Sequence, residues 1–227
     1  MPNAPKRTIA VLGGTGKEGS GLALRWAHAG HSILIGSRST ERAREAAAGI
    51  NARAGAQRAT GADNRSAAQG AEIVVLAVPY SAQLTMLSEV KAVLDGKILI
   101  DVTVPLVPPK VSTAQLPDGG SAVLKAQAML GSGVRVVSAF QNVSAEHLTL
   151  GQVIDCDVLV CGDDRDAREA AVALARDAGM RAFHAGPLAN SVVAEALTSV
   201  LIAINRQYKI KHSGIRITGL PDDAGRG

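Results

Sequence analysis

Aromatic residues are scarce in this sequence of 227 residues, where phenylalanine, tyrosine and tryptophan together make up 2%. They are scattered along the chain as Trp26, Tyr80, Phe140, Phe183 and Tyr208. Modules that bind single-stranded nucleic acid stack successive bases on several neighbouring aromatic side chains. The sequence therefore excludes that class of module, and we expect no nucleic-acid partner.

Cysteine is also rare. Cys156 and Cys161 are too few for a disulfide framework, and no second pair or nearby histidine completes a zinc site. The histidines are spread without metal-ligand spacing, at His28, His31, His147, His184 and His212. We therefore expect no metal and a reducing compartment, the cytoplasm.

Long apolar runs and long runs of like charge are missing as well. Residues 1–7 have no signal-peptide core, and the most apolar late stretch, 191–204, is shorter than a membrane span and contains Glu195. The net charge of +4 is spread along the chain. The sequence thus predicts a cytoplasmic protein with no membrane partner, and its charge favours anionic small molecules only weakly.

Short β-branched segments alternate with segments that carry apolar residues at helical spacing. The strand-like segments are 9–12, 32–35, 73–78, 98–102, 134–138, 158–161 and 181–184. The helix-like segments are 17–28, 41–54, 82–94 and 165–178. Most strand segments are apolar throughout, as expected of strands buried on both faces of a parallel sheet. Residues 1–184 are therefore predicted to form a Rossmann-like, doubly wound α/β domain with a mostly parallel sheet.

Two regions break this alternation. Residues 103–133 are rich in proline and glycine, with a helix only at about 121–130, and we expect this loop to form a wall of the site. Residues 185–227 form a small C-terminal helical appendage, in which Pro187 opens a helix that runs to about Gln207. The apolar face of this helix at 192–204 predicts either a homodimer contact or packing on the sheet.

The first strand leads directly into a glycine-rich loop, in which Gly14, Gly16 and Gly19 fit the pattern G-x-G-x-x-G. In this motif the first glycine permits the tight turn and the second lets the backbone approach a pyrophosphate. The third lets the helix pack on the strand. The N-terminus of that helix supplies unpaired N–H groups and partial positive charge. The motif predicts a dinucleotide site, and the alternative is a glycine turn with a structural role only.

The end of the second strand predicts which dinucleotide binds. NAD enzymes place a carboxylate there, about 20 residues past the glycines, whereas this chain has Ser37 and Arg38, with Arg42 one turn later. A carboxylate would repel a 2′-phosphate, but serine and arginine form hydrogen bonds and ion pairs with it. The sequence therefore favours NADP. The alternative is that Ser37 and Arg38 cap a helix and face solvent.

Polar and cyclic residues follow two later strands. Val78, Pro79 and Tyr80 end the third predicted strand, and Gln141 follows the fifth. Ligands lie at this edge of an open α/β sheet, so these residues are candidates to contact a nicotinamide, although Tyr80 could equally be ordinary packing. No local Ser/His/Asp or Cys/His set suggests a catalytic residue. Hydride exchange between two rings depends mainly on their positioning.

Five segments together resemble the NADPH-dependent F420 reductase family, the F420H2:NADP oxidoreductases. In chain order they are Ile9-Ala10-Val11-Leu12-Gly13-Gly14-Thr15-Gly16, Gly36-Ser37-Arg38, Val160-Cys161-Gly162-Asp163-Asp164, Ala185-Gly186-Pro187-Leu188-Ala189-Asn190-Ser191 and Gly214-Ile215. The resemblance covers residues 8–220, and its most specific part is 185–191. One departure is Gln141, which stands where members often carry histidine.

The resemblance implies that NADP lies across the glycine loop and that the deazaflavin ring of coenzyme F420 stacks over the nicotinamide. The residues it places beside the phosphates are Thr15, Gly16, Lys17, Glu18, Ser37, Arg38 and Arg42. Beside the nicotinamide it places Val78 and Ala145. Against the deazaflavin it places Pro187, Asn190, Ser191 and the backbone near Ser213.

The function that the resemblance implies is hydride transfer between NADP(H) and coenzyme F420, by an NADP-dependent oxidoreductase whose partners are these small molecules. Two alternatives stay open. In the first alternative, the protein is a reductase that passes hydride from NADPH to a flavin or another small acceptor. In the second, it is a non-catalytic NADP-binding sensor. A sensor has no need of a second ring pocket, which is the feature that separates the two classes.

Overall fold

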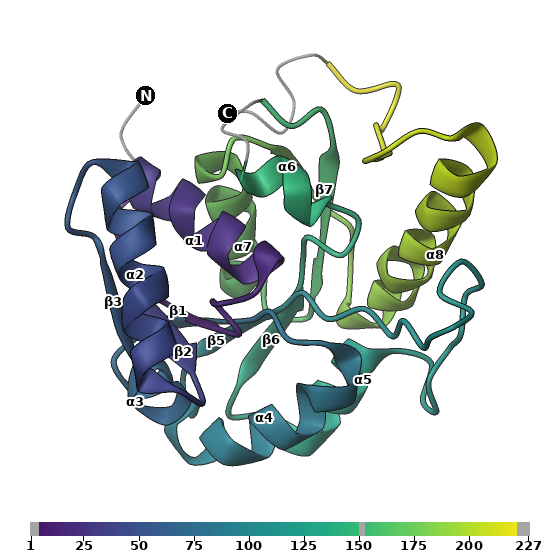
Figure 1. Cartoon of the computed structure of the whole chain (residues 1–227). Helices are drawn as coiled ribbons and strands as arrows, with labels where there is room; N and C mark the ends of the chain where they lie inside the picture. Colours follow the sequence, from purple (N-terminus) through teal and green to yellow (C-terminus); the bar gives the residue numbers. More distant parts are fainter. Residues whose placement is uncertain (1–4, 150–152, 222–227) are drawn as a thin grey trace.

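A central sheet carries helices on both faces in the computed structural model, which describes residues 5–149 and 153–221 (Figure 1). The strand order is β3-β2-β1-β4-β5-β6-β7-β8. All neighbours are parallel except β6 and β7, which are antiparallel. The strands are β1 Thr8–Leu12, β2 Ser32–Ser37, β3 Ala59–Asp63, β4 Ile73–Leu76, β5 Ile98–Asp101, β6 Arg135–Ser138, β7 Asp157–Gly162 and β8 Arg181–His184. The prediction of a doubly wound, mostly parallel sheet is confirmed.

The helices are α1 Lys17–Ala29, α2 Thr40–Ala54, α3 Asn64–Gln69, α4 Gln83–Val90, α5 Ala122–Leu130, α6 Ala145–Thr149, α7 Arg165–Asp177 and α8 Ser191–Tyr208. Three short 3-10 turns are η1 Tyr80–Ala82, η2 Lys91–Val93 and η3 Leu188–Asn190. Side-chain caps fix several helix starts: Ser39 accepts from the Arg42 N–H and Asp164 from the Ala167 N–H. Asp164 thus caps the helix that follows β7.

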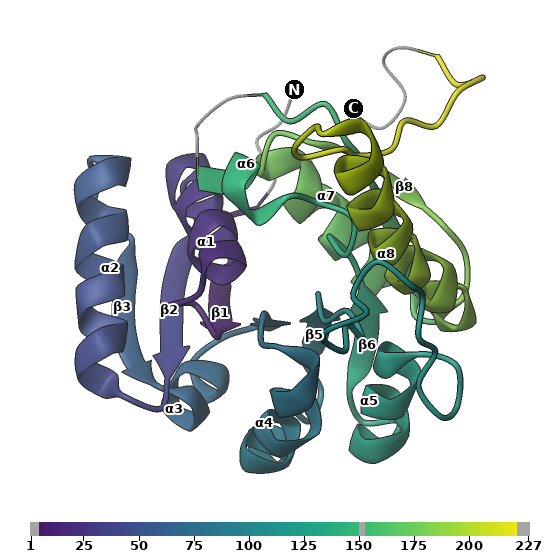
Figure 2. The same ribbon diagram turned by 45° about the vertical axis from the view of Figure 1, so that its right-hand side comes forward.

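The apolar strands are buried on both faces because their side chains alternate between two separate clusters. Ile9 and Val11 of β1 join one cluster, with α1, α2 and α7, whereas Ala10 and Leu12 join the other, with α3, α4 and α5. The two helical layers are visible on opposite sides of the sheet (Figure 2). This two-sided burial explains why these segments read as continuous apolar runs.

The sequence did not predict β3, α3 or α6. The β3 segment, Ala-Thr-Gly-Ala-Asp, has a single β-branched residue, and tertiary contacts hold it in place. The buried side chain of Asn51 accepts from the N–H groups of Arg58 and Ala59 and donates to the Ala59 carbonyl. Conversely, the single helix predicted over 82–94 is divided between the end of η1, α4 and η2.

Helix α8 is longer than the apolar stretch 191–204, which the sequence marked as shorter than a membrane span. Together with η3 it spans Leu188–Tyr208, and by length and composition alone it is apolar enough to cross a membrane. The core helix of a soluble protein meets the same criteria of length and composition. In the second turn of α8, Glu195 is buried, and its carboxylate accepts from the N–H groups of Ala122 and Val123 and from the Ser121 hydroxyl. This carboxylate joins α8 to the start of α5.

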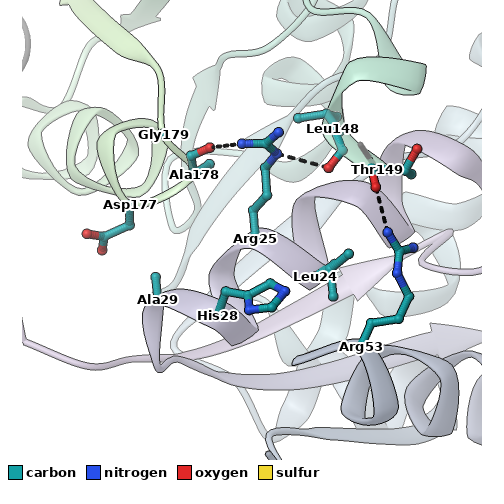
Figure 3. Close-up of a pocket in the computed structure, with 10 residues that line it drawn as sticks. All are labelled: Leu24, Arg25, His28, Ala29, Arg53, Leu148, Thr149, Asp177, Ala178 and Gly179. Carbon is teal, nitrogen blue, oxygen red and sulfur yellow. Dashed lines mark hydrogen bonds between the residues drawn. The ribbon is translucent and has the colours of Figure 1, made fainter. Parts of the chain in front are cut away.

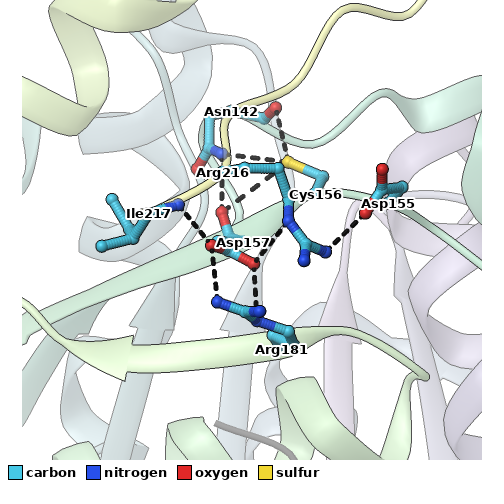
Figure 4. Close-up of polar contacts among 7 residues, drawn as sticks. All are labelled: Asn142, Asp155, Cys156, Asp157, Arg181, Arg216 and Ile217. Atoms are coloured by element: carbon cyan, nitrogen blue, oxygen red, sulfur yellow. Dashed lines mark hydrogen bonds and ion pairs between the residues drawn. The ribbon is translucent and has the colours of Figure 1, made fainter. Parts of the chain in front are cut away.

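Asp157 of β7, a buried residue, holds both β8 and the C-terminal segment after α8 (Figure 4). Arg181 Nε lies 3.1 Å from Oδ1 of Asp157, and the Ile217 N–H donates to Oδ2 of Asp157 at 2.6 Å. The Asp157 N–H donates in turn to the Ile215 carbonyl. Residues 185–221 therefore pack on the predicted Rossmann domain, and the boundary between 184 and 185 stays a prediction.

We expect Asp157→Ala to lower the free energy of unfolding by about 3–5 kcal/mol, because it leaves the guanidinium of Arg181, which is 6% exposed, without its carboxylate. Asp155→Ala is the matched control. Its exposed carboxylate pairs with Arg216, so the loss there is about 0–1 kcal/mol. Urea unfolding followed by circular dichroism measures the stability of both variants. Equal losses for the two variants would contradict the role of Asp157 in pairing with Arg181 and holding the C-terminal segment.

Candidate functional site

Three cavities follow one another along the edge of the sheet where the parallel strands β1, β2, β4, β5 and β6 end. The Arg38 cavity has a volume of 350 Å³, the central cavity 410 Å³ and the α8 cavity 190 Å³. The first two share Gly16, Ala77, Val78 and Pro79. The last two share Gln141, Val143 and Thr198. The three therefore form one trough at the edge where open α/β sheets bind ligands.

The structure brings most of the predicted residues to this trough. The Arg38 cavity is lined by Thr15, Gly16, Ser37, Arg38, Arg42, Val78 and Pro79. The central cavity is lined by Gly16, Lys17, Glu18, Val78, Pro79, Tyr80 and Gln141. The α8 cavity is lined by Gln141 and Ser213. Tyr80 thus borders the trough rather than packing in the core.

The tight turn between β1 and α1 depends on Gly13, which the motif did not single out. Gly13 has a φ of +82°, and a Cβ there would lie 2.3 Å from the Ala77 carbonyl oxygen, so no other residue fits without rearrangement. Gly14 and Gly19 are buried, and a Cβ on Gly19 would lie 2.7 Å from the Gly13 carbonyl oxygen. These glycines pack the turn against the helix.

Gly16 differs from its neighbours in facing open space. A Cβ there would meet only the Gly13 carbonyl oxygen, at 3.3 Å, and Gly16 lines both the Arg38 and the central cavity. As the N-cap of α1 it provides no side-chain acceptor for the N–H groups of the first turn. The loop therefore offers a ligand both close access to the backbone and unpaired donors.

The Arg38 cavity is basic where an NAD enzyme carries a carboxylate. Arg38 and Arg42 are exposed on its rim, and Ser37 Oγ accepts from the Ser39 N–H at 3.3 Å. The helix cap is Ser39, so the alternative that Ser37 and Arg38 cap α2 is wrong. Oδ1 of Asn64, a residue with no exposed surface, has no partner in the described structure, and Asn64 lines this cavity. The arginines fit the 2′-phosphate of NADP, and the Asn64 amide oxygen, which can only accept, fits a hydroxyl or amino donor of its adenosine.

The central cavity has apolar walls and unpaired oxygens. Val78, Pro79 and Val143 contribute apolar surface. Gln141 donates through Nε2 to the Asp101 carbonyl at 2.8 Å, while its Oε1 has no partner among the described residues. The hydroxyl of Thr103 is likewise unpaired and buried. Such oxygens beside apolar walls fit a ring system with polar edges.

Carboxyl groups with raised pKa values lie at and behind this cavity. Burial, and to a lesser extent the charge of Asp101, raises the pKa of Glu18 to about 8. Burial raises the pKa of Asp101, although the donors of Thr103 and Gln83 oppose this shift. Burial also raises the pKa of Glu195. The centre of the trough thus favours the protonated form of Glu18, in contrast with the basic end of the trough.

The α8 cavity lies between α8 and the segment that follows β6. The Thr198 hydroxyl donates to the Gln141 carbonyl at 2.7 Å, which joins α8 to the floor of the trough. The imidazole Nδ1 of His212 lies 2.8 Å from Ser144 Oγ, and the Ser213 N–H donates to Oδ1 of Asn205. The C-terminal segment therefore closes this end of the trough and places Ser213 there.

Four further predicted residues lie outside the three cavities. Ala145 begins α6, two residues after Val143 of the trough. Asn190 donates to the Ala185 carbonyl, Pro187 is exposed, and the Ser191 hydroxyl lies 2.7 Å from that of Ser138. Their predicted contact with a ring system stays a prediction, because the part of α8 that lines the trough begins at Thr198.

Sequence reasoning missed Gly13, Asn64, Thr103 and Thr198. Asn64 and Thr103 follow the carboxyl ends of β3 and β5, so the edge rule applied to every strand would have found Thr103. It would have found Asn64 only if β3 had been predicted. Thr198 carries no local signal, since only the packing of α8 brings it to the trough. Among the described residues, no group of three or more histidine, cysteine, aspartate or glutamate side chains could hold a metal ion.

A larger cavity of 680 Å³ lies away from the trough, between α1, α2, α6 and α7 (Figure 3). The guanidinium of Arg25 donates there to the carbonyls of His147, Leu148 and Ala178 at 2.9–3.0 Å. Arg53 donates to the Thr149 carbonyl. These arginines hold α1 and α2 against α6 and α7, so their donors serve the packing of helices.

Comparison with known proteins agrees with the geometry of the trough. Residues 8–105 match the family described as NADP oxidoreductase coenzyme F420-dependent. The F420-dependent NADP reductase of Methanothermobacter marburgensis is 43% identical over 222 residues, covering 94% of this chain and 99% of the relative. That of Methanocaldococcus jannaschii is 41% identical over 221 residues, covering 93% and 98%.

Solved structures support the same fold. A crystal structure from Arthrobacter sp. FB24 matches with a TM-score of 0.76 at 24% identity, covering 93% of this chain and 99% of that chain. The NADP-bound pyrroline carboxylate reductase of Plasmodium falciparum matches with a TM-score of 0.60 at 14% identity, covering 89% and 66%. At more than 40% identity over nearly its whole length, the chain belongs to the family of F420-dependent NADP reductases.

Proposed function

We propose that this protein transfers a hydride between NADP(H) and the deazaflavin coenzyme F420. The observation that carries the proposal is the continuity of the trough, in which a basic cavity beside a glycine loop opens into an apolar chamber with unpaired oxygens. The names of the archaeal relatives give the acceptor. A sensor that binds NADP alone has no need of the second chamber.

In this proposal NADP binds with its 2′-phosphate against Ser37, Arg38 and Arg42 and its pyrophosphate over Gly16. The unpaired N–H groups at the start of α1 bind the phosphates, with Thr15 and Lys17 beside them. The nicotinamide lies toward Val78 and Ala145. These residues thus bind the nucleotide and orient its ring for the hydride step.

The deazaflavin ring occupies the central cavity in this proposal. Tyr80 and Gln141 border it, and Ser213 lies at the α8 end of the trough, where the tail of the coenzyme leaves. Pro187 and Asn190 lie just before α8, and Ser191 is its first residue. In this proposal they hold in place the helix that carries Thr198. Stacking of the two rings brings donor and acceptor carbons within reach of each other and excludes water.

The test is to mix purified protein with NADPH and F420 and to follow the loss of both absorbances. Equal molar consumption of the two compounds supports the proposal. Parallel mixtures with FMN and FAD test the alternative that a flavin is the acceptor. NADPH binding without consumption in any mixture would leave the sensor as the correct class.

Arg38→Ala should weaken NADPH binding and leave NADH binding much less affected, because only NADPH loses a charged partner for its 2′-phosphate. The expected cost is about 1.5–3 kcal/mol, roughly tenfold to over a hundredfold in affinity. Isothermal titration calorimetry with both nucleotides measures it. Arg44→Ala, which removes an exposed arginine of α2 outside the trough, is the control. Equal losses for the two nucleotides would refute NADP preference.

Gly16→Val should abolish NADPH binding while the protein stays folded. The new side chain meets only one backbone oxygen and otherwise fills the space where the pyrophosphate approaches. Gly49→Val is the control, since Gly49 lies in α2 and a Cβ there would meet no atom within 4 Å. Calorimetry reports binding and thermal unfolding reports the fold. Binding of wild-type strength would place the phosphates elsewhere.

We propose further that the protein acts in the cytoplasm as a homodimer. Both cysteines are free, which fits a reducing compartment. Val193 and Val200 of α8 are 62% and 49% exposed, although Ala194 and Leu201 beside them are buried. The helix therefore packs one face on its own chain and leaves an apolar stripe for a second copy.

Val193→Glu combined with Val200→Glu should convert the dimer to a monomer, because two carboxylates would be buried opposite their own copies. Analytical ultracentrifugation of wild-type and variant protein measures the change. Leu116→Glu, at an exposed apolar residue of the loop before α5, is the control. A wild-type protein that sediments as a monomer would refute the homodimer.

A further inference from the structure

The carboxyl group of Glu18 occupies an unusual place in the trough. Glu18 lies in the first turn of α1, half-buried, and lines the central cavity. It accepts no hydrogen bond from any residue described. Two other polar atoms of residues that line this cavity, Gln141 Oε1 and Thr103 Oγ1, are also unpaired, although these residues are only 3% and 2% exposed. The cavity therefore presents a carboxyl group and two free oxygens to whatever fills it.

These oxygens indicate the chemistry of the occupant. An amide oxygen can only accept, so Gln141 Oε1 requires an N–H or O–H donor from the ligand. Buried polar groups of this kind are rarely left unpaired in the functional state of a protein. A ring with N–H groups at its edge, flanked by the apolar walls of the cavity, meets this requirement.

The groups around Glu18 favour its protonated form. The charge of Asp101 on β5 raises the pKa of Glu18, and it also raises the pKa of Glu195 on α8. Tyr80 lines the same cavity as Glu18. Lys17, the neighbouring cation, lies 3.8 Å from Glu146 of α6 instead. Desolvation within the cavity and, to a lesser extent, the charge of Asp101 raise the pKa of Glu18 to about 8, so its proton is held at neutral pH.

Asp101 is not available for the same role. Both of its carboxylate oxygens already accept hydrogen bonds, one from the Thr103 N–H at 2.8 Å and the other from Gln83 Nε2 at 2.6 Å. Its side chain has no exposed surface and does not line the cavity. Of these two carboxyl groups, only Glu18 can exchange a proton with a ligand.

We propose that Glu18 is the general acid and base of the reaction, which gives a proton to the acceptor ring when hydride arrives and takes it back in reverse. This inference rests on the proposed function. In the forward direction the C–H bond at C4 of the dihydronicotinamide breaks and a C–H bond forms at the acceptor carbon. The electron pair released in the acceptor ring moves to a ring nitrogen, and that nitrogen takes the proton as the Glu18 O–H bond breaks. Water then reprotonates the carboxylate.

The proposal predicts opposite pH dependences for the two directions. Reduction of F420 by NADPH requires the acid form, so turnover falls as pH rises through about 8. Oxidation of reduced F420 by NADP requires the carboxylate, so turnover rises over the same range. Glu18→Gln keeps the shape but loses the proton, and it should lower turnover roughly 100-fold and remove the inflection near pH 8 from both profiles, leaving only the pH dependence that the proton consumed in the overall reaction imposes. NADPH affinity is measured in parallel, because the resemblance places Glu18 beside the phosphates of NADP, and a loss of affinity as large as the loss of turnover would refute the acid–base role.

Two further variants complete the kinetic test. Glu18→Asp keeps a titratable group and should retain the pH dependence at reduced turnover. Glu45→Gln, at an exposed position of α2, should behave as wild type. Circular dichroism confirms that each variant is folded. A folded Glu18→Gln protein with wild-type turnover and pH profile would refute the role of Glu18 and leave the proposed function intact.

A measurement without turnover provides an independent readout. Infrared difference spectra of the ligand-free protein, recorded across pH 6–10, should show one carboxylic acid band that disappears with a midpoint near 8. That band should be absent from Glu18→Gln and present in Glu45→Gln. Its absence from wild type would refute the proposal. If the band is present but wild type consumes no F420 with NADPH, the proposed function fails and the catalytic role of Glu18 fails with it.

Discussion

The turn from β1 into α1 is the constraint on which the rest of the structure depends. Gly13 takes a left-handed conformation directly against the Ala77 carbonyl, and the Ala77 N–H donates to the Leu12 carbonyl. The ends of β1 and β4 are thereby held together with no side chain between them. This close approach leaves the N-terminus of α1 open at the sheet edge and leaves Gly16 facing space. A larger residue at Gly13 would separate the strands and close the trough.

The trough that this turn creates has opposite electrostatics at its two ends. Exposed arginines at the end of β2 favour phosphate, whereas at the centre burial and the nearby charge of Asp101 favour the neutral form of the Glu18 carboxyl group. A basic end anchors a nucleotide, and an apolar, proton-holding centre suits exchange of hydride between rings. Binding and chemistry are thus separated along one continuous surface.

The sequence by itself determined the sheet and the nucleotide end of the site. Continuous apolar runs and the glycine loop are local signals, and Ser37 and Arg38 follow directly from their place after a strand. These residues lie in segments whose position is set by the neighbouring strand, so spacing alone located them. The family resemblance was likewise readable from short motifs, because each keeps its order in the chain.

Only the tertiary structure decided the rest. The β3 segment is weakly β-forming and is held by the buried Asn51, so no local pattern marks it. Thr198 reaches the trough because Glu195 fixes α8 to the start of α5, a contact between residues more than 70 positions apart. The raised pKa of Glu18 also arises from burial and from Asp101, on a distant strand. A sequence shows that a residue carries a carboxyl group, but burial and neighbouring charge, which determine its proton affinity, exist only in the folded chain.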